Sequence, residues 1–545
     1  MAKESHLLAL IDTEQQEREM GSVGAEDDGS AGSVRNKNRA VESEVNGDGF
    51  GGDTTGHQDP SEIRRKSDRR FYVFACAVLA SLNTVLLGYD VGVMSGAIIF
   101  IQEDLKITEV QAEVLVGCLS VVSLFGSLAG GRTSDIIGRK WTMAVGAIVF
   151  QVGAAAMTFA YSFQALMIGR FLTGVGIGIG GVITSVYIAE ISPSISRGRL
   201  TSFPEVFINI GILLGYVSNY AFSGLSVHVN WRVMLGVGIL PSALIGFALF
   251  VIPESPRWLV MQNRVDEARL VLSKTNGDES EVEERLAEIK LAAGAGSNAQ
   301  TQGEKAVWRE LLCPSPSLRW MLVTGIGLQC FQQLTGTDAA VYYSPEIFKD
   351  AGIKGNSNLL AATVAVGITK TSFVLVATFL IDKLGRKPLL YISTIGMTVC
   401  LFSVGVSLSL LKEGVAGAAP VLAILSVCGT LAFFSVGIAP ICWVLTSEIF
   451  PLRYRAQAVA LGAAANRVCS GLVGMSFLSV SHTITVAGTF FAFAAMSALS
   501  VAFVHLVVPE TKGKSLEQIE SLFQDHHSGK GGYVEIEDVE DHVHE

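Results

Sequence analysis

The stretch VLVGCLSVVSLFGSLAGGRTSDIIGRK, residues 114–140, shows the pattern that decides the fold: an apolar run, then a short basic segment. Residues 114–131 of this stretch carry no ionisable acidic or basic side chain before the run ends. Such a run is roughly long enough to cross about 30 Å of hydrocarbon as a helix. A helix is expected because lipid offers no partner to backbone polar groups.

Eleven similar apolar runs lie on either side of this one, so we expect twelve transmembrane helices. The expected spans, numbered 1–12 in chain order, are 71–94, 114–131, 141–161, 165–188, 203–222, 233–252, 321–343, 359–381, 389–411, 421–445, 459–478 and 484–508. They form two groups of six, at 71–253 and 320–508. The fold class predicted is an all-α integral membrane protein.

The polar segments between and around these groups are expected to lie outside the membrane. Residues 1–70 are rich in Gly, Ser, Asp and Glu, which predicts a disordered tail. Residues 254–319 form a linker whose charge pattern predicts short helices near 265–274 and 280–292. Residues 509–545 form a second tail.

Composition excludes several classes of function. Hydrophobic residues make up 50% of the chain and charged residues only 17%, below the roughly 25% of soluble proteins. The net charge of −10 argues against nucleic acid as a partner, because that would need a clustered basic face. The eight cysteines show no metal-ligand spacing, and no catalytic motif occurs, so we expect neither a metal, a cofactor nor an enzyme.

The distribution of Lys and Arg predicts the orientation. Basic residues gather in the loops between spans 2 and 3, 4 and 5, 8 and 9, and 10 and 11, whereas the opposite side is sparse. Short cytoplasmic loops carry this excess in membrane proteins. Both termini and the linker are therefore expected in the cytoplasm.

The two groups of six spans repeat three motifs in matching places. Gly138-Arg139-Lys140 recurs as Gly385-Arg386-Lys387, Glu190-Ile191 as Glu448-Ile449, and Pro253-Glu254 as Pro509-Glu510. Parallel six-helix repeats with a substrate site between them build one large class of secondary transporters.

These motifs carry a resemblance to the sugar porter family of the major facilitator superfamily. Gly131 to Lys140, Pro253 to Trp258, Gln332-Gln333 and Pro509 to Gly513 look like that family's signatures, over roughly residues 70–525. The details at 202–205 and 336–339 resemble the plant polyol/monosaccharide branch. The resemblance implies two pseudo-symmetric halves that rock about a central site.

Asp90 in span 1 and Arg170 in span 4 are candidates for proton coupling. Charged side chains within spans are costly and mark function by default. A static ion pair that fixes two helices is one interpretation. The other is a proton switch, in which Arg170 sets the proton affinity of Asp90. The resemblance favours the switch, because proton-coupled members carry this pair and facilitators tend to lack the acid.

Gln332 and Gln333, in the middle of span 7, are candidates for substrate binding together with Asp338 and Tyr342. An amide donates and accepts, which suits a substrate hydroxyl. Polar side chains in spans also hold helices together, which is the alternative. The resemblance assigns the glutamines to sugar binding, and implies a stacking role for Trp443 and a hydroxyl contact for Asn466.

Two of the candidates for substrate binding depart from the wider family. Asp338 stands where hexose and pentose porters carry Asn, and Glu205 stands where they carry Gln. An ionised carboxylate only accepts hydrogen bonds. Both acids could accept from polyol hydroxyls; alternatively both are protonated, or Glu205 faces a neighbouring helix.

A set of charged residues at the cytoplasmic helix ends resembles the network that latches the two halves of the family in the outward-facing state. Topology determinants are the alternative. The set is Asp135, Arg139, Glu190, Arg197, Asp382, Arg386, Glu448, Arg453 and Arg455. The run Gly174 to Gly180 looks like a nucleotide loop, but it lies inside an apolar span, so we interpret it as close helix packing.

The function predicted is a proton-coupled symporter of polyols or monosaccharides, with protons as the coupling ion. An uncoupled facilitator and a transport-deficient sugar sensor are the alternatives. We expect a monomer with a small-molecule substrate, in the plasma membrane rather than the vacuolar membrane.

Overall fold

The computed structural model describes residues 60–193, 200–275, 279–294, 309–311, 313–413, 419–450 and 455–512. Every regular element in these ranges is a helix, and no strand occurs in them. The prediction of an all-α protein is confirmed.

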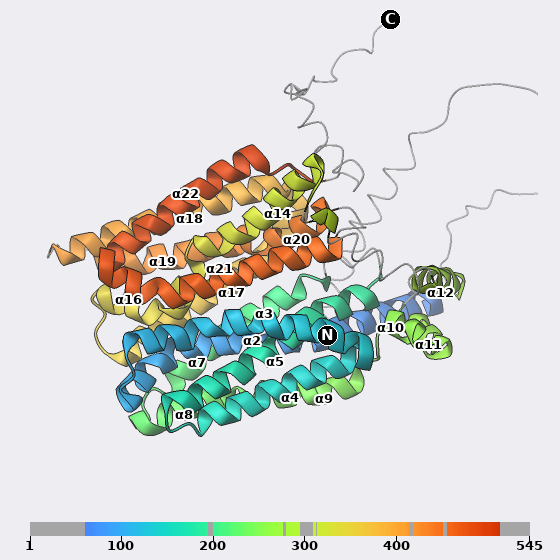
Figure 1. Cartoon of the computed structure of the whole chain (residues 1–545), viewed down its shortest axis with the longest axis horizontal. Helices are drawn as coiled ribbons and strands as arrows, with labels where there is room; N and C mark the ends of the chain where they lie inside the picture. Colours follow the sequence, from blue (N-terminus) through green and yellow to red (C-terminus); the bar gives the residue numbers. More distant parts are fainter. Residues whose placement is uncertain are drawn as a thin grey trace, which may run out of the picture. The chain divides into compact units, whose positions relative to one another are not determined.

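The first six expected spans are formed by helices that pack on one another (Figure 1). They are α2 (Pro60–Leu105), α3 (Glu109–Ile137), α4 (Arg139–Thr158), α5 (Phe163–Ile191), α7 (Phe203–Phe222), and the pair α8 (Val227–Val237) and α9 (Ile239–Val251). We call this set the N half. Its main contacts pair α4 and α3 with α5, and α2 with α7. Helix α2 begins before the expected start at residue 71.

The remaining spans form a second set, the C half. It comprises α14 (Pro316–Leu334), α15 (Thr337–Tyr342), α16 (Ser344–Asp350), α17 (Asn356–Leu384), α18 (Arg386–Lys412), α19 (Ala419–Val436), α20 (Ile438–Ile449), α21 (Arg455–Ile484) and α22 (Val486–Val507). In the described residues, 11 helices are long and apolar enough to cross a membrane. They match every expected span except span 7, which is divided between α14 and α15, with α16 beginning just beyond its expected end.

The break in span 7 lies at Gly336. Its φ of +79° is left-handed, and a Cβ there would collide with the ring of Phe493. A second break, at Gly437, divides span 10 into α19 and α20, where the freed N–H of Ile438 donates to Ser393 Oγ at 3.0 Å. Non-helical backbone at membrane depth is tolerated where protein buries it or a cavity needs it. Both breaks lie close in sequence to candidate substrate residues.

The glycine run of α5 packs against its neighbours. A Cβ on Gly176 would lie 2.6 Å from the backbone N of Phe150 in α4, and one on Gly178 would overlap the carbonyl of Ser123 in α3. The interpretation as a packing motif rather than a nucleotide loop is confirmed.

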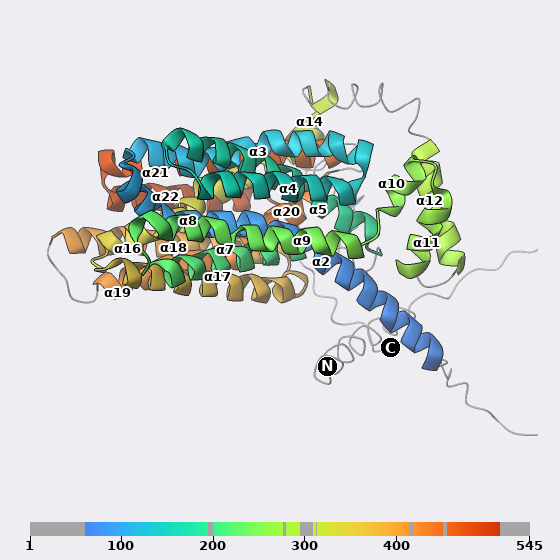
Figure 2. The same cartoon turned by 90° about the horizontal axis from the view of Figure 1, so that it is seen from below.

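The linker contains α10 (Pro256–Met261), α11 (Val265–Thr275) and α12 (Glu279–Gly294), which lie beyond the end of α9 (Figure 2). Their apolar side chains form a small core of their own that includes Leu272 and Leu286. Trp258 Nε1 anchors this group by donating to the carbonyl of Asp135 at 3.0 Å. The helices predicted near 265–274 and 280–292 are α11 and α12.

Candidate functional site

Asp90 and Arg170 form a buried ion pair within the N half. The distance from Arg170 Nη1 to Asp90 Oδ2 is 2.5 Å, and the two side chains are 0% and 2% exposed, respectively. The remaining guanidinium donors bond the carbonyls of Leu115 and Val116 in α3, at 2.8 and 3.2 Å. The pair therefore joins α2, α5 and α3, and a change of charge on Asp90 would be felt by all three.

The candidate amides of the C half form one hydrogen-bonded group. Asn466 in α21 donates to Gln332 Oε1 at 2.7 Å and accepts from Gln333 Nε2 at 3.2 Å. Gln332 Nε2 also donates to the carbonyl of Ala439, just after the break at Gly437, at 3.2 Å. The structure thus brings together three of the predicted binding residues, beside the broken backbone of span 10.

Gln329 belongs to the same group, although the sequence analysis did not select it. Its Oε1 accepts from Asn466 at 3.0 Å. Its spacing of three and four residues from Gln332 and Gln333 was the available signal. In the described part of the chain, Gln329 Nε2 and Gln333 Oε1 are buried without a hydrogen-bond partner. Buried polar groups are normally paired, so a ligand that both donates and accepts hydrogen bonds would satisfy these two atoms.

Asp338 and Tyr342, on the short helix α15, lie between this amide group and the N half. Ser470 of α21 donates to Asp338 Oδ2 and also meets Ser120 of α3 at 3.0 Å. The phenol of Tyr342 is buried within electrostatic range of Arg170, Asp338 and Asp90. Through Tyr342, the predicted substrate residues therefore come within electrostatic range of the predicted proton pair.

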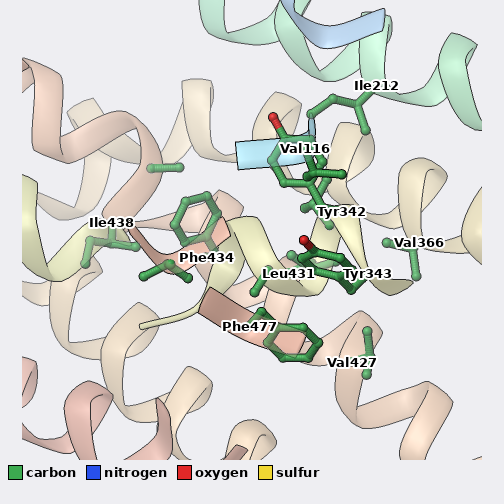
Figure 3. Packing of buried hydrophobic residues seen from close by; sticks show 14 of the residues in the cluster. Val116, Ile212, Tyr342, Tyr343, Val366, Val427, Leu431, Phe434, Ile438 and Phe477 are labelled. Atoms are coloured by element: carbon green, nitrogen blue, oxygen red, sulfur yellow. The ribbon is translucent and has the colours of Figure 1, made fainter. Parts of the chain in front are cut away.

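The buried cluster around Tyr342 draws on both halves. Figure 3 shows Val116 and Ile212 from the N half together with Tyr342, Val366 and Phe434 from the C half. The site is thus formed where the two halves meet.

Glu205 lies on α7 with its Oε1 accepting from Asn209 Nδ2 at 3.3 Å. Opposite, Lys370 on α17 is buried and interacts electrostatically with Glu205 and Asp338. Lys370 was not among the residues predicted from the sequence, although a basic residue in the middle of span 8 was itself a signal.

Trp443 is partly exposed on α20, a helix that packs against α14. Among the described residues its indole makes no hydrogen bond or ion pair. A stacking role would use the ring face and remains a prediction.

Among the described residues, hydrogen bonds between the halves join α3 to α21, and α7 to α15 and α17. Glu113 of α3 accepts from Ser479 N and Oγ of α21, at 2.8 and 2.5 Å. Thr371 Oγ1 of α17 donates to the carbonyl of Asn209 in α7 at 3.2 Å. The Glu113 contact lies near the start of α3, at the far end of that helix from Asp135 and the linker helices.

The charge network predicted at the other end forms ion pairs within each half. Arg139 binds Glu190 at 3.1 Å and Asp135 at 3.1 Å, and Arg386 binds Glu448 at 2.9 Å. Arg197, Arg453 and the side chains of Asp382 and Arg455 lie outside the described residues. A latch between the halves therefore remains a prediction.

Two further carboxylates accept hydrogen bonds from the backbone of the basic motifs at these helix ends. Glu254 accepts from the backbone N of Arg139 at 2.9 Å, and Glu510 from that of Arg386 at 3.1 Å. Burial raises the pKa of Glu254 above its usual value, and the backbone donors of Ser255, Lys140 and Arg139 offset this only in part. Burial also acts on Glu510, but backbone donors at 511–512 and 386–387 overcome it and lower its pKa.

The model of the family described as "Sugar (and other) transporter" matches residues 76–523. The chain belongs to this family. It is 65% identical over 513 residues to "Probable polyol transporter 4" of Arabidopsis thaliana, covering 94% of this chain and 95% of that protein. It is 48% identical over 468 residues to "Polyol transporter 5" of the same plant, covering 84% and 87%. Membership makes the chain a transporter and not an enzyme, as predicted.

Solved structures give the same fold. The proton:xylose symporter XylE of the major facilitator superfamily, bound to a bromodeoxyglucose, aligns with a TM-score of 0.70 at 28% identity, covering 84% of this chain and all of that one. An inward open form of XylE from E. coli aligns with a TM-score of 0.69 at 27% identity, covering 83% and 99%. The chain is a multi-pass membrane protein with the major facilitator fold, and sugars or polyols are its substrate class.

Proposed function

We propose that this transporter is a proton-coupled symporter of polyols that works by alternating access, with Asp90 as the proton carrier. The observation that carries the proposal is the buried 2.5 Å pair between Arg170 and Asp90, which interacts electrostatically with Tyr342 on α15. A carboxylate fixed by a buried cation can bind a proton only if the pair loosens, so protonation and helix movement are linked.

Polyols are proposed as the substrate because the described site is rich in paired donors and acceptors. Gln329, Gln332, Gln333 and Asn466 supply amides, and Asp338 and Glu205 supply carboxylates. The relatives named as polyol transporters support the same choice.

The test is uptake of labelled sorbitol into vesicles with and without an inward proton gradient. The wild type should accumulate sorbitol above equilibrium only when the gradient is present. Asp90→Asn should abolish accumulation while exchange down a sorbitol gradient survives, because the amide cannot cycle a proton. Glu103→Gln makes the same charge change at an exposed position of α2 and is the matched control. Gradient-driven accumulation by Asp90→Asn would remove Asp90 as the carrier, and equal uptake by the wild type under both conditions would identify a facilitator.

We also propose that both termini and the linker face the cytoplasm, and that the protein acts as a monomer in the plasma membrane. The basic loops support the orientation. The site lies between two halves of one chain, so one copy is sufficient. Impermeant thiol labelling of intact cells should reach a cysteine placed at Gly355 and not one placed at Gly277, and a fluorescent fusion reports the membrane.

A further inference from the structure

Lys370 is a buried cation that the proposed coupling mechanism does not use. It lies in the middle of α17 and is 7% exposed. Within the described residues its ammonium has no hydrogen-bond or ion-pair partner, and Nζ lies 5.7 Å from the ring centroid of Phe434. Charged side chains within membrane spans are costly, so one retained without a direct partner needs a functional explanation.

The charges that face Lys370 come from both halves. Its ammonium interacts electrostatically with Glu205 of α7 and Asp338 of α15, and Arg467 of α21 interacts with Glu205 as well. Two acids and two bases thus meet at the site, with no net charge when all four are ionised.

The packing of α17 fixes Lys370 at the boundary between the halves. One residue on, Thr371 bonds the backbone of Asn209 at 3.2 Å, and three residues before, a Cβ on Gly367 would lie 2.8 Å from the ring of Tyr216. Helices α17 and α7 are therefore in close contact on both sides of Lys370.

Asn209, whose backbone carbonyl accepts from Thr371, also has an unpaired polar atom. Its Oδ1 is buried without a partner among the described residues, and the ammonium of Lys370 offers three donors. A substrate hydroxyl, which donates and accepts, would satisfy an ammonium on one side and a carboxylate on the other.

We propose that Lys370 is a substrate-binding residue that sets the preference for polyols, with its ammonium donating to a hydroxyl group held between Glu205 and Asp338. This inference rests on the proposed function and deepens it. It adopts one of the alternatives given for the two acids, in which both accept from substrate hydroxyls. Charge-assisted hydrogen bonds are roughly twice as strong as neutral ones. They therefore favour a flexible chain of hydroxyls, which loses more entropy on binding than a ring.

The experiment measures sorbitol and glucose uptake by Lys370→Met, Lys370→Arg, Glu205→Gln and the double variant Lys370→Met with Glu205→Gln. Lys383→Met removes an exposed charge from the same helix and is the matched control. The amount of each variant in the membrane is measured in parallel.

Lys370→Met should raise the half-saturation concentration for sorbitol by about tenfold to a hundredfold, the range expected for a hydrogen bond to a charged group. Glucose should be affected less, so the sorbitol-to-glucose ratio falls. Lys370→Arg should keep the ratio near that of the wild type. The double variant should lose little more than either single variant, because the two charges act as a unit.

A purely structural lysine would give a different result. Lys370→Met would then lower the membrane amount and the maximal rate for both solutes and leave half-saturation and ratio unchanged, which would overturn the inference. If Lys370→Met fails to insert, the charge-balanced double variant answers the question: an unchanged sorbitol-to-glucose ratio in it overturns the inference. A wild type that transports neither solute would instead refute the proposed function.

Discussion

The repeated motif forms one corner in each half with the same arrangement of residues, and comparing the two corners shows how the surroundings change the strength of its ion pair. The N-half corner comprises 138–140, Glu190 and Glu254, and the C-half corner comprises 385–387, Glu448 and Glu510. In each, a glycine with positive φ ends one helix and starts the next, and φ is +97° at Gly138 and +95° at Gly385. In each, one glutamate binds the backbone of the basic pair and another binds the arginine side chain.

The corners differ in depth. The Arg139 and Glu190 side chains are 9% and 10% exposed, whereas Arg386 and Glu448 are 15% and 23% exposed. Helix α10 covers the N-half corner, where Ser255 donates to Glu190 and Trp258 bonds the carbonyl of Asp135. The motif therefore fixes which groups meet, and the neighbouring segment decides how strongly their charges interact.

The largest expected effect is at the arginine pairs. Glu190→Gln should destabilise the protein by about 3 kcal/mol, because it breaks a buried two-bond pair, and Glu448→Gln by about 1 kcal/mol. The measurement is the melting temperature in detergent, with Glu190→Asp as a charge-retaining control. Equal losses at the two corners would show that burial does not distinguish them.

Glu254 and Glu510 should respond to pH in opposite directions. The raised pKa of Glu254 means that its ionised form costs stability, so the advantage of the wild type over Glu254→Gln shrinks as the pH rises through the folded pKa. The lowered pKa of Glu510 means that the advantage over Glu510→Gln is present above the ordinary value of 4.5 and is lost as the pH falls below it. Each effect should be about 1 kcal/mol at most, because both groups are partly open to water.

Melting curves between about pH 3 and about pH 7.5 make this comparison. For each variant, the melting temperature is subtracted from that of the wild type at every pH. As the pH rises, this difference should fall for Glu254→Gln and grow for Glu510→Gln. Parallel changes would contradict the assignment of burial to one corner and backbone donors to the other.

Much of the architecture was available from sequence, because apolar length and Lys/Arg placement act locally along the chain. The pairing of Asp90 with Arg170 was available because ionisable side chains in lipid must find partners, whereas the bonds of Asn466 to Gln332 and Gln333 were not predicted. The ion pair follows from a rule that any fold of this chain must satisfy.

What the sequence could not show depends on which helix faces which. The chain has 57 glycines, and nothing local marks Gly336 and Gly437 as the breaks in spans 7 and 10. Lys370 could not be assigned to the site without knowing that α17 packs against α7. Long-range packing decides both.

The smallest expected effect is the difference between removing the hydroxyl that bonds the glutamate in one corner and removing its counterpart in the other. Ser255 donates to Glu190, and Thr511 donates to Glu448 at 2.6 Å, so removing either hydroxyl costs one charge-assisted bond. Ser255 has a second role, because its Oγ also accepts from Trp258 N at 3.4 Å as the N-cap of α10. Each variant loses one charge-assisted hydrogen bond, and these losses largely cancel in the comparison. Ser255→Ala should therefore destabilise the protein more than Thr511→Val only by the contribution of the N-cap bond, about 0.5 kcal/mol for so long a bond. Ser255→Thr keeps both bonds and should match the wild type in melting temperature. If Thr511→Val destabilises the protein as much as Ser255→Ala does, the N-cap bond contributes nothing to stability. The stability of the N-half corner then comes from burial of its ion pair alone.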